Sequence, residues 1–132
     1  MNSSGLQGGA PICLVEEKQT IFLSTQGQAQ EAYERGDGRL VSLSHTNEEN
    51  LRFTSEDLLA TGLIGPGDVL GVASMDTPGQ PESVQAGVVD VMEAAGVEVV
   101  FDVLGCDGGS ICTGGLPQSV TNMKDAGITH FF

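Results

Sequence analysis

Basic residues are scarce in this chain: five Lys and Arg stand against 18 Asp and Glu, which gives a formal net charge of −13 at pH 7. Proteins that bind nucleic acid or anionic membranes do so with clustered Lys and Arg, and the sequence contains no such cluster. Nucleic acid and an anionic membrane surface are therefore poor candidates for partners. The acidity is explained more simply by solubility than by attraction of cationic ligands.

Long apolar stretches are also missing. No run approaches the roughly 18 apolar residues that span a bilayer, so nothing in this segment inserts into a membrane. The N-terminal stretch has neither the basic segment nor the apolar run of a signal peptide. Such an absence normally indicates the cytosol, unless the sequence is a segment of a longer protein.

Aromatic residues are few, with no Trp, one Tyr and five Phe, but the 132 residues suffice for one ordinary domain with a core. A repeat gives the clearest structural information. Residues 92–101 return in altered form as residues 123–132, and each copy reads as a helix end, a glycine and an apolar strand that closes on Phe. The offset matches one strand–helix–strand unit, which predicts a parallel sheet with crossover helices. The second copy stops within an expected buried strand, so we expect the chain to be part of a longer protein.

The remaining pattern places an α/β order around this repeat. A capping-box spacing at Thr54 and Asp57, with Phe53 and Leu58 as a hydrophobic staple, indicates a helix start, and that helix is expected to end at Gly62. Residues 28–38 are polar and carry a turn signal. The expected helices are 7–18, 81–95 and 116–127 in addition to the one ending at Gly62, and the expected strands are 20–23, 40–43, 69–73, 97–103 and the chain end.

Helical periodicity also predicts which side chains face inward: Ile12, Leu14 and Val15 in the first helix, and Leu116, Val120 and Met123 in the last. From residue 48 onward the order is αβαβαβ, which is typical of an α/β fold. Elements before 44–47 are short and polar and those after it are regular. We therefore place a boundary there, between segments 1–46 and 47–132.

Two of the three cysteines lie close together. Cys106 and Cys112 enclose a short Gly-rich loop, and closing so small a ring by a disulfide would add about 2–3 kcal/mol in the chain-entropy model. Two free thiols or half of a metal site are the alternatives, but the spacing is not that of a zinc site and no metal is expected. A disulfide would indicate an oxidising compartment. Cys13 lies in an apolar helix pattern and is expected to be buried.

Signatures of catalysis are weak. The sequence has no G-x-S-x-G and no phosphate-binding Gly-Lys-Ser/Thr loop, and His45 and His130 are its only histidines. Asp76 follows a strand as a phosphoacceptor would, but the other parts of such a site are missing. We therefore expect no enzyme and no cofactor. A flavodoxin-like signalling or enzyme domain that uses Asp76 or a cysteine remains the alternative.

Hydroxyl-bearing loops follow the expected strands at their carboxyl ends, where open parallel sheets bind ligands. They carry Ser24 with Thr25, then Asp76 with Thr77, and 2–5 would be another such loop if a strand precedes it. Neutral donors of this kind suit a small polar or carboxylate ligand. The alternative is that these residues only cap helices.

These residues together resemble the type I periplasmic or extracellular solute-binding proteins, of the branched-chain amino-acid receptor type. The loop 2–5, the helix after it and residues 20–25 are similar to ligand loops of the family's first lobe. Residues 68–73, the helix 81–95 and residues 96–100 are similar to the opening of the second lobe, and 114–127 to its next unit. The resemblance implies an incomplete binding-protein fold, with a partial first lobe in 1–46, a hinge crossing near 44–47 and a partial second lobe in 47–132.

The same resemblance implies a function. A small solute (an amino acid, an amide or a small carboxylate) would bind between two lobes and be delivered to an ABC transporter permease, in the periplasm or outside the cell, with the signal sequence not in this segment. The family often places an aromatic residue in the loop that here carries Asp76, Thr77 and Gln80, and no Tyr or Trp stands there. The implied ligand-binding residues are Ser3, Ser4, Ser24, Thr25, Asp76, Thr77 and Gln80.

Overall fold

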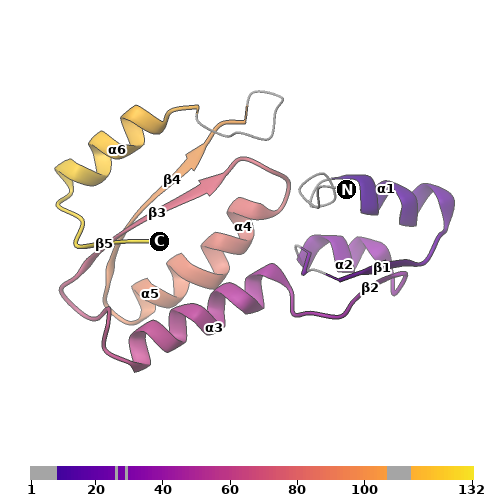
Figure 1. The fold of residues 1–132 in the computed structure, drawn as a ribbon, viewed down its shortest axis with the longest axis horizontal. Coiled ribbons are helices and arrows are strands. Elements are labelled where there is room, and N and C mark those ends of the chain that lie inside the picture. The colour runs from indigo at the N-terminus through magenta and orange to yellow at the C-terminus, as the bar shows by residue number, and fades with distance from the viewer. Residues whose placement is uncertain (1–8, 26, 29, 107–113) are drawn as a thin grey trace.

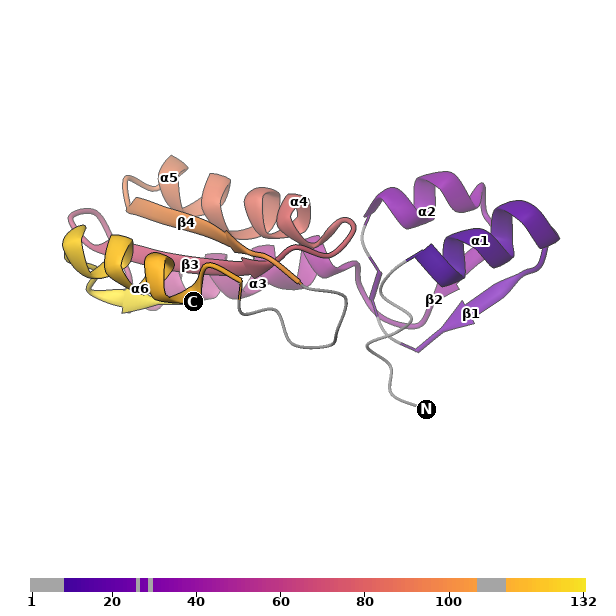
Figure 2. The ribbon, with the colours of Figure 1, turned by 90° about the horizontal axis from the view of Figure 1, so that it is seen from above.

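A computed structural model describes residues 9–25, 27–28, 30–106 and 114–132 (Figure 1). The side chains of residues 9–12 and 31 are not described. The chain forms two units that lie one after the other along the long axis of the molecule (Figures 1 and 2). Each unit has its own parallel sheet, and residues 43–46 connect them. The expected α/β class with parallel strands and crossover helices is therefore confirmed.

The first unit contains the helix α1 (Gly9–Lys18), the strand β1 (Phe22–Ser24), the helix α2 (Gln30–Gly36) and the strand β2 (Leu40–Ser42). β1 and β2 pair in parallel, with Leu23 opposite Val41. Both helices cover one face of this small sheet, where Val15, Ala32 and Leu40 form its buried core. Leu23 and Val41 lie on the other face and are exposed, and no helix among the described residues covers this face.

Several expectations for the first unit are wrong. No helix is expected in residues 28–38, which are polar and carry a turn signal, but they contain α2, because the run Gln-Glu-Ala-Tyr-Glu-Arg consists mostly of good helix formers. Leu14 was expected to face inward but is exposed, and Cys13 is exposed rather than buried, because only Val15 of this turn reaches the two-stranded sheet.

The second unit is larger. Its helices are α3 (Asn47–Ala60), α4 (Gln80–Val84), the π-helical turn η2 (Gln85–Val89), α5 (Asp90–Ala94) and α6 (Leu116–Asp125), and its strands are β3 (Val69–Met75), β4 (Glu98–Leu104) and β5 (His130–Phe131). The strand order is β4-β3-β5, all parallel. The main core lies between one sheet face and the helices α3 to α5, around Leu70, Val72, Val88 and Met92. None of the helices in the described part of the chain is long and apolar enough to cross a membrane.

The helix α3 starts at Asn47, earlier than the sequence pattern indicates. Thr46 is the N-cap and forms a capping box with Glu49, whereas the expected cap, Thr54, lies inside the helix and donates its hydroxyl to the Asn50 carbonyl at 2.9 Å. Phe53, the expected staple residue, is exposed. Both threonines have an acidic residue three positions later, so spacing alone does not distinguish them. The earlier cap prevails because it lets Leu51 pack against the core.

The expected helix 81–95 is continuous through α4, η2 and α5, and η2 contacts α3 closely. Gly87 in η2 meets the α3 backbone: a Cβ at this position would lie 2.7 Å from the Glu48 carbonyl oxygen. This close approach explains why the residue is glycine. Periodicity cannot reveal one extra residue per turn, so the π-helical turn was not predicted.

The repeat of the sequence corresponds to a repeat in structure. Met92 and Met123 are both buried, and Gly96 and Gly127 both have left-handed φ angles, 83° and 71°, after the ends of their helices. The strands that follow, β4 and β5, flank the central β3 on its two sides.

The expected inner face of α6 is only partly right. Met123 is 4% exposed, but Leu116 and Val120 are 40% and 56% exposed, and the buried residues of this helix are Ser119 and Met123. Phe132 packs against the core, whereas Phe131 is exposed beside a pocket of about 350 Å³ that includes Val120.

Candidate functional site

The carboxyl edges of the two sheets face one another. β2 leads directly into the linker 43–46, and β1 runs parallel to it, so both strands of the first unit end on the side of the second unit. In the second unit, β3 and β4 end on the side that faces the first unit (Figures 1 and 2). The loops that follow these strands therefore lie at opposed edges, where ligands of parallel sheets bind.

The structure brings some of the predicted ligand residues to these edges. Ser24 is the last residue of β1 and is buried, and its hydroxyl accepts a hydrogen bond from the side-chain amide of Gln28 at 3.3 Å. Thr25 follows it and is exposed. Ser3 and Ser4 lie outside the described residues.

On the opposite edge, Asp76 and Thr77 follow β3. Asp76 is exposed, and its backbone N–H donates to the Leu104 carbonyl at 2.9 Å, which fixes the loop to the end of β4. Thr77 is half-buried, and Gln80 is the first residue of α4, its N–H bonded to the Thr77 carbonyl at 3.0 Å. The Asp76 carboxylate makes no ion pair within the described ranges 9–25, 27–28, 30–106 and 114–132.

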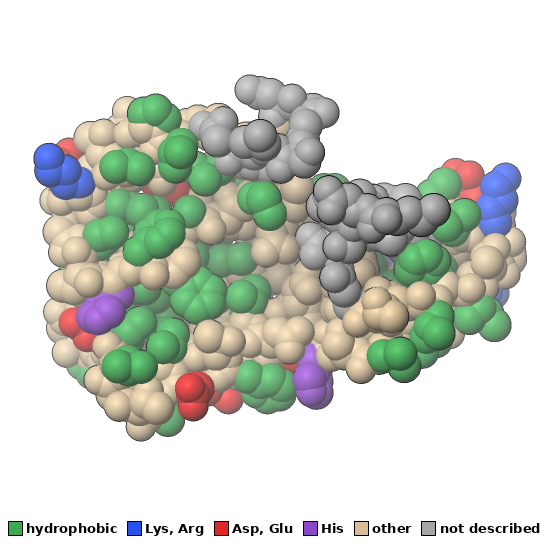
Figure 3. All heavy atoms as spheres, viewed as in Figure 1, with side chains coloured by type: hydrophobic (Ala, Val, Ile, Leu, Met, Phe, Trp, Pro, Cys, Tyr) green, Lys and Arg blue, Asp and Glu red, His purple; other side chains and the backbone are tan. Residues whose placement is uncertain are grey.

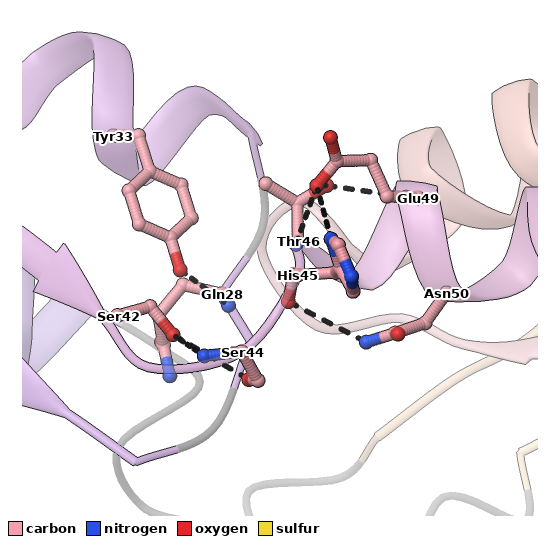
Figure 4. A network of polar contacts seen from close by, with 8 residues as sticks. All are labelled: Gln28, Tyr33, Ser42, Ser44, His45, Thr46, Glu49 and Asn50. Atoms are coloured by element: carbon pink, nitrogen blue, oxygen red, sulfur yellow. Dashed lines mark hydrogen bonds and ion pairs between the residues drawn. The ribbon is translucent and has the colours of Figure 1, made fainter.

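The linker carries a polar network that the sequence analysis missed (Figure 4). The backbone N–H of Thr46 donates to the Glu49 carboxylate at 2.9 Å, and the Glu49 N–H donates to the Thr46 hydroxyl at 3.1 Å. His45 Nδ1 lies 3.7 Å from the same carboxylate, and Asn50 donates its side-chain amide to the His45 carbonyl at 3.4 Å. The backbone N–H and the hydroxyl of Thr46 hold the pKa of Glu49 below its usual value, with a smaller effect from His45.

A pocket of about 460 Å³ lies beside this network. It contains none of the predicted ligand residues, because it opens along β2 and the linker rather than at the ends of β1 and β3. The alternation of Ser, Leu, Ser and His at 42–45, between a strand and a helix, is the signal that could have indicated it. The pocket is lined by Tyr33, Leu40, Val41, Ser42, Leu43, Ser44, His45, Thr46 and Glu49.

Gln28 is a second residue that the sequence analysis missed. It is only 4% exposed although it lies in a polar run, and it connects three elements. Its side-chain amide donates to Ser24, its backbone N–H donates to the Tyr33 hydroxyl at 3.2 Å, and its carbonyl accepts from the Asn47 N–H at 3.1 Å. Nothing in the local sequence distinguishes this glutamine from its neighbours.

Charge is distributed unevenly over the molecule. The visible Lys and Arg side chains in Figure 3 lie near its two ends. Arg35 pairs with Glu16 at 2.8 Å and Arg52 with Glu48 at 3.4 Å. One carboxylate oxygen of Asp102, on β4, is buried and has no hydrogen-bond partner among the residues that the structure describes. No three His, Cys, Asp or Glu side chains among the described residues are grouped so that they could hold a metal ion.

Of the three cysteines, Cys13 and Cys106 lie within the described residues. Cys13 is an exposed free thiol, and the Cys106 Sγ atom lies 3.7 Å from the Leu104 carbonyl oxygen. Cys112 lies outside the described residues, so its pairing with Cys106 stays a prediction.

Comparisons of the chain with family models, with curated proteins and with solved structures find no match.

Proposed function

We propose that this chain contributes to a two-lobed binding protein that closes on a small solute and delivers it to an ABC transporter, as the resemblance to type I solute-binding proteins implies. The observation that carries the proposal is the arrangement of the two parallel sheets, whose carboxyl edges face one another across a short linker. Two-lobed binding proteins use this arrangement to hold a ligand between loops of both lobes and to close around it by hinge motion.

The side chains at the two edges favour binding over bond breaking. Ser24 and Thr25 offer hydroxyls from the first lobe, and Thr77 and Gln80 offer a hydroxyl and an amide from the second. Such groups can both donate to and accept from an amino acid, an amide or a carboxylate. Ser3 and Ser4 are proposed to add donors from the first lobe. The transporter partner and a periplasmic or extracellular location belong to the same proposal.

The bare apolar surfaces are consistent with lobes that further structure covers. Leu23 and Val41 are exposed on the open face of the first sheet, and Val120 and Phe131 are exposed beside the edge strand of the second. A sheet that is apolar on a face normally buries it against another layer. Additional helices on these faces would complete two lobes of the proposed kind.

The test is a solute screen on the 132-residue chain. Amino acids, amides and small carboxylates are compared by thermal shift, and each solute that raises Tm is then examined by calorimetry and small-angle scattering. We expect saturable binding with a decrease in radius of gyration. Thr77→Ala and Ser24→Ala should each weaken it by about tenfold, or 1.4 kcal/mol.

Asn122→Ala is the matched control, because Asn122 is exposed near the end of α6, on the side of the sheet where β3 begins rather than where it ends. The proposal fails if no solute of these classes binds, or if both edge variants bind as well as the control.

A further inference from the structure

Gln28 is a buried amide at the junction of the two units. A primary amide that is removed from water requires hydrogen-bond partners inside the protein. Its side-chain nitrogen has one in the hydroxyl of Ser24, at 3.3 Å, at the end of β1. This bond joins Gln28 to the sheet of the first unit through a residue that the proposed function assigns to the ligand site.

The backbone of residues 27 and 28 is held by the other unit. The Gln28 carbonyl accepts a hydrogen bond from Asn47, the first residue of α3. Gly27 is buried against the linker so tightly that a Cβ there would overlap the His45 carbonyl oxygen and lie 3.2 Å from the Asn47 Oδ1 atom. The chain therefore crosses between the units once, at 43–46, but a second segment, 27–28, is also fastened to the start of α3.

The side-chain amide and the backbone N–H of Gln28 are thus bonded within the first unit, to Ser24 and Tyr33, whereas its carbonyl is bonded to Asn47 of the second unit. A change in the angle between the units moves Asn47 relative to Ser24, and Gln28 joins both. A solute that donates a hydrogen bond to the Ser24 hydroxyl, or accepts one from it, contacts the same oxygen that accepts from the Gln28 amide. Occupancy at Ser24 and the angle between the units are then linked through one side chain.

We propose that Gln28 is a positioning residue that couples contact at Ser24 to the angle between the two lobes. The inference rests on the proposed solute-binding function. It assigns Gln28 no contact with the solute: its role is exerted through Ser24 on one side and Asn47 on the other.

The test measures the distance between the units directly. Spin labels are placed at two exposed positions, Glu34 on α2 and Glu93 on α5, in a chain with Cys13→Ser, and the distance distribution is measured by pulsed electron resonance without reductant. Gln28→Met keeps the length of the side chain and removes the amide. Ser24→Ala removes the other partner of the same bond.

We expect each single variant to broaden the distance distribution by about twofold or more. The double variant should be no broader than Ser24→Ala alone, because the Ser24 substitution already breaks the bond that Gln28→Met removes. Val15→Ala is the control for loss of stability: it opens the core of the first unit and lowers Tm, but should leave the width unchanged. A double variant whose broadening equals the sum of the two single broadenings would overturn the inference. So would a Gln28→Met chain that loses Tm without broadening.

The outcome separates the inference from the proposed function. If the solute panel binds and Gln28→Met leaves the distribution unchanged, the coupling fails and solute binding stands. If no solute binds but the variants broaden the distribution without additivity, Ser24 and the angle between the units are still coupled through Gln28. The solute-binding function then fails.

Discussion

The hydroxyl of Ser55 donates a hydrogen bond of 2.9 Å to the carbonyl oxygen of Gly87, and both residues are buried. This bond lies where α3 crosses the π-helical turn η2. Gly87 has no space for a side chain there, since a Cβ would lie 2.7 Å from Leu51 Cβ as well as from the Glu48 carbonyl oxygen. The crossing fixes α3, which begins at the linker, to the helix that begins at the Asp76–Gln80 loop.

Gly87→Ala should lower the free energy of unfolding by about 1–3 kcal/mol, because overpacking forces α3 away from η2. Ser55→Ala should lower it by about 1–3 kcal/mol, since a buried acceptor loses its partner. Urea denaturation followed by circular dichroism measures both. Gly65→Ala, where the added Cβ meets open space, is the control and should be close to neutral. Equal stability of the Gly65 and Gly87 variants would show that α3 does not pack on η2 as described.

The two threonine caps give a paired prediction. Thr46→Ala should destabilise the chain by about 1 kcal/mol, because it removes the N-cap of α3. Thr54→Ala should be neutral or slightly stabilising, because Ala is the better helix former at an exposed interior position. Thermal unfolding of the two variants decides which threonine starts the helix. The opposite order of Tm values would place the helix start at Thr54.

Stability should depend on Glu49 at acidic pH. Its pKa is lowered in the folded chain by the Thr46 N–H and hydroxyl, so its stabilising contribution is complete above the ordinary value of about 4.5 and is lost as the pH falls below it. Glu49→Gln should therefore reduce stability at pH 7 and flatten its decline between neutral and acidic pH. Urea midpoints across this range measure the effect. Glu56→Gln, on the exposed side of the same helix, carries the same charge change and should keep the steep decline.

The state of the cysteines predicts how many alkyl groups the denatured chain takes up. Cys13 is an exposed free thiol, and Cys106 is predicted to form a disulfide. If Cys112 is its partner, the denatured chain takes up one alkyl group without reductant and three after reduction. Intact mass spectrometry reads this directly, and Cys13→Ser should lower both counts by one. Three alkylations without reductant would contradict the pairing and weaken the case for an oxidising compartment.

The net charge of −13 predicts how the affinity of the protein for charged solutes depends on the salt concentration. Raising the ionic strength from 0.01 M to 0.1 M shortens the Debye length from about 30 Å to about 10 Å, which screens repulsion between the protein and an anion. Among solutes that bind, carboxylates should gain affinity with salt, whereas uncharged amides of the same length should not. Calorimetric titrations at the two salt concentrations test this. A carboxylate that loses affinity as salt rises would indicate a cationic site that the five basic residues do not explain.

Sequence reasoning predicted the regular elements of the second unit well. Apolar periodicity and glycine stops located β3, β4 and the helix 81–95, because each buries a clear apolar face against the core. It failed where the apolar signal is narrow or ambiguous. α2 was missed because only one or two of its side chains need to be buried. The start of α3 was misplaced because two capping-box spacings occur and only tertiary packing selects between them.

For the candidate site, strand order predicted which loops lie at the carboxyl edges, and Ser24 and Asp76 lie there. The pocket beside His45 and the junction at Gln28 were not predictable. Both depend on how the linker returns past the loop after β1, and local sequence does not specify such a contact. A glycine that packs against a carbonyl, as Gly27 does, looks in the sequence like any loop glycine, because the segment that it contacts lies eighteen positions later in the chain.

The strand order also has a consequence for how the chain assembles. β1 and β2 pair across one short helix, and β3, the centre of the larger sheet, precedes both of its neighbours in the chain. Contacts between segments close in sequence form quickly. On the ribosome, the first unit can close before α3 is made, and the second can grow outward from β3 as β4 and then β5 emerge. The larger sheet is complete only when β5 has been made, because Leu70 of β3 pairs with His130 of β5, so the smaller sheet can be complete well before the larger one.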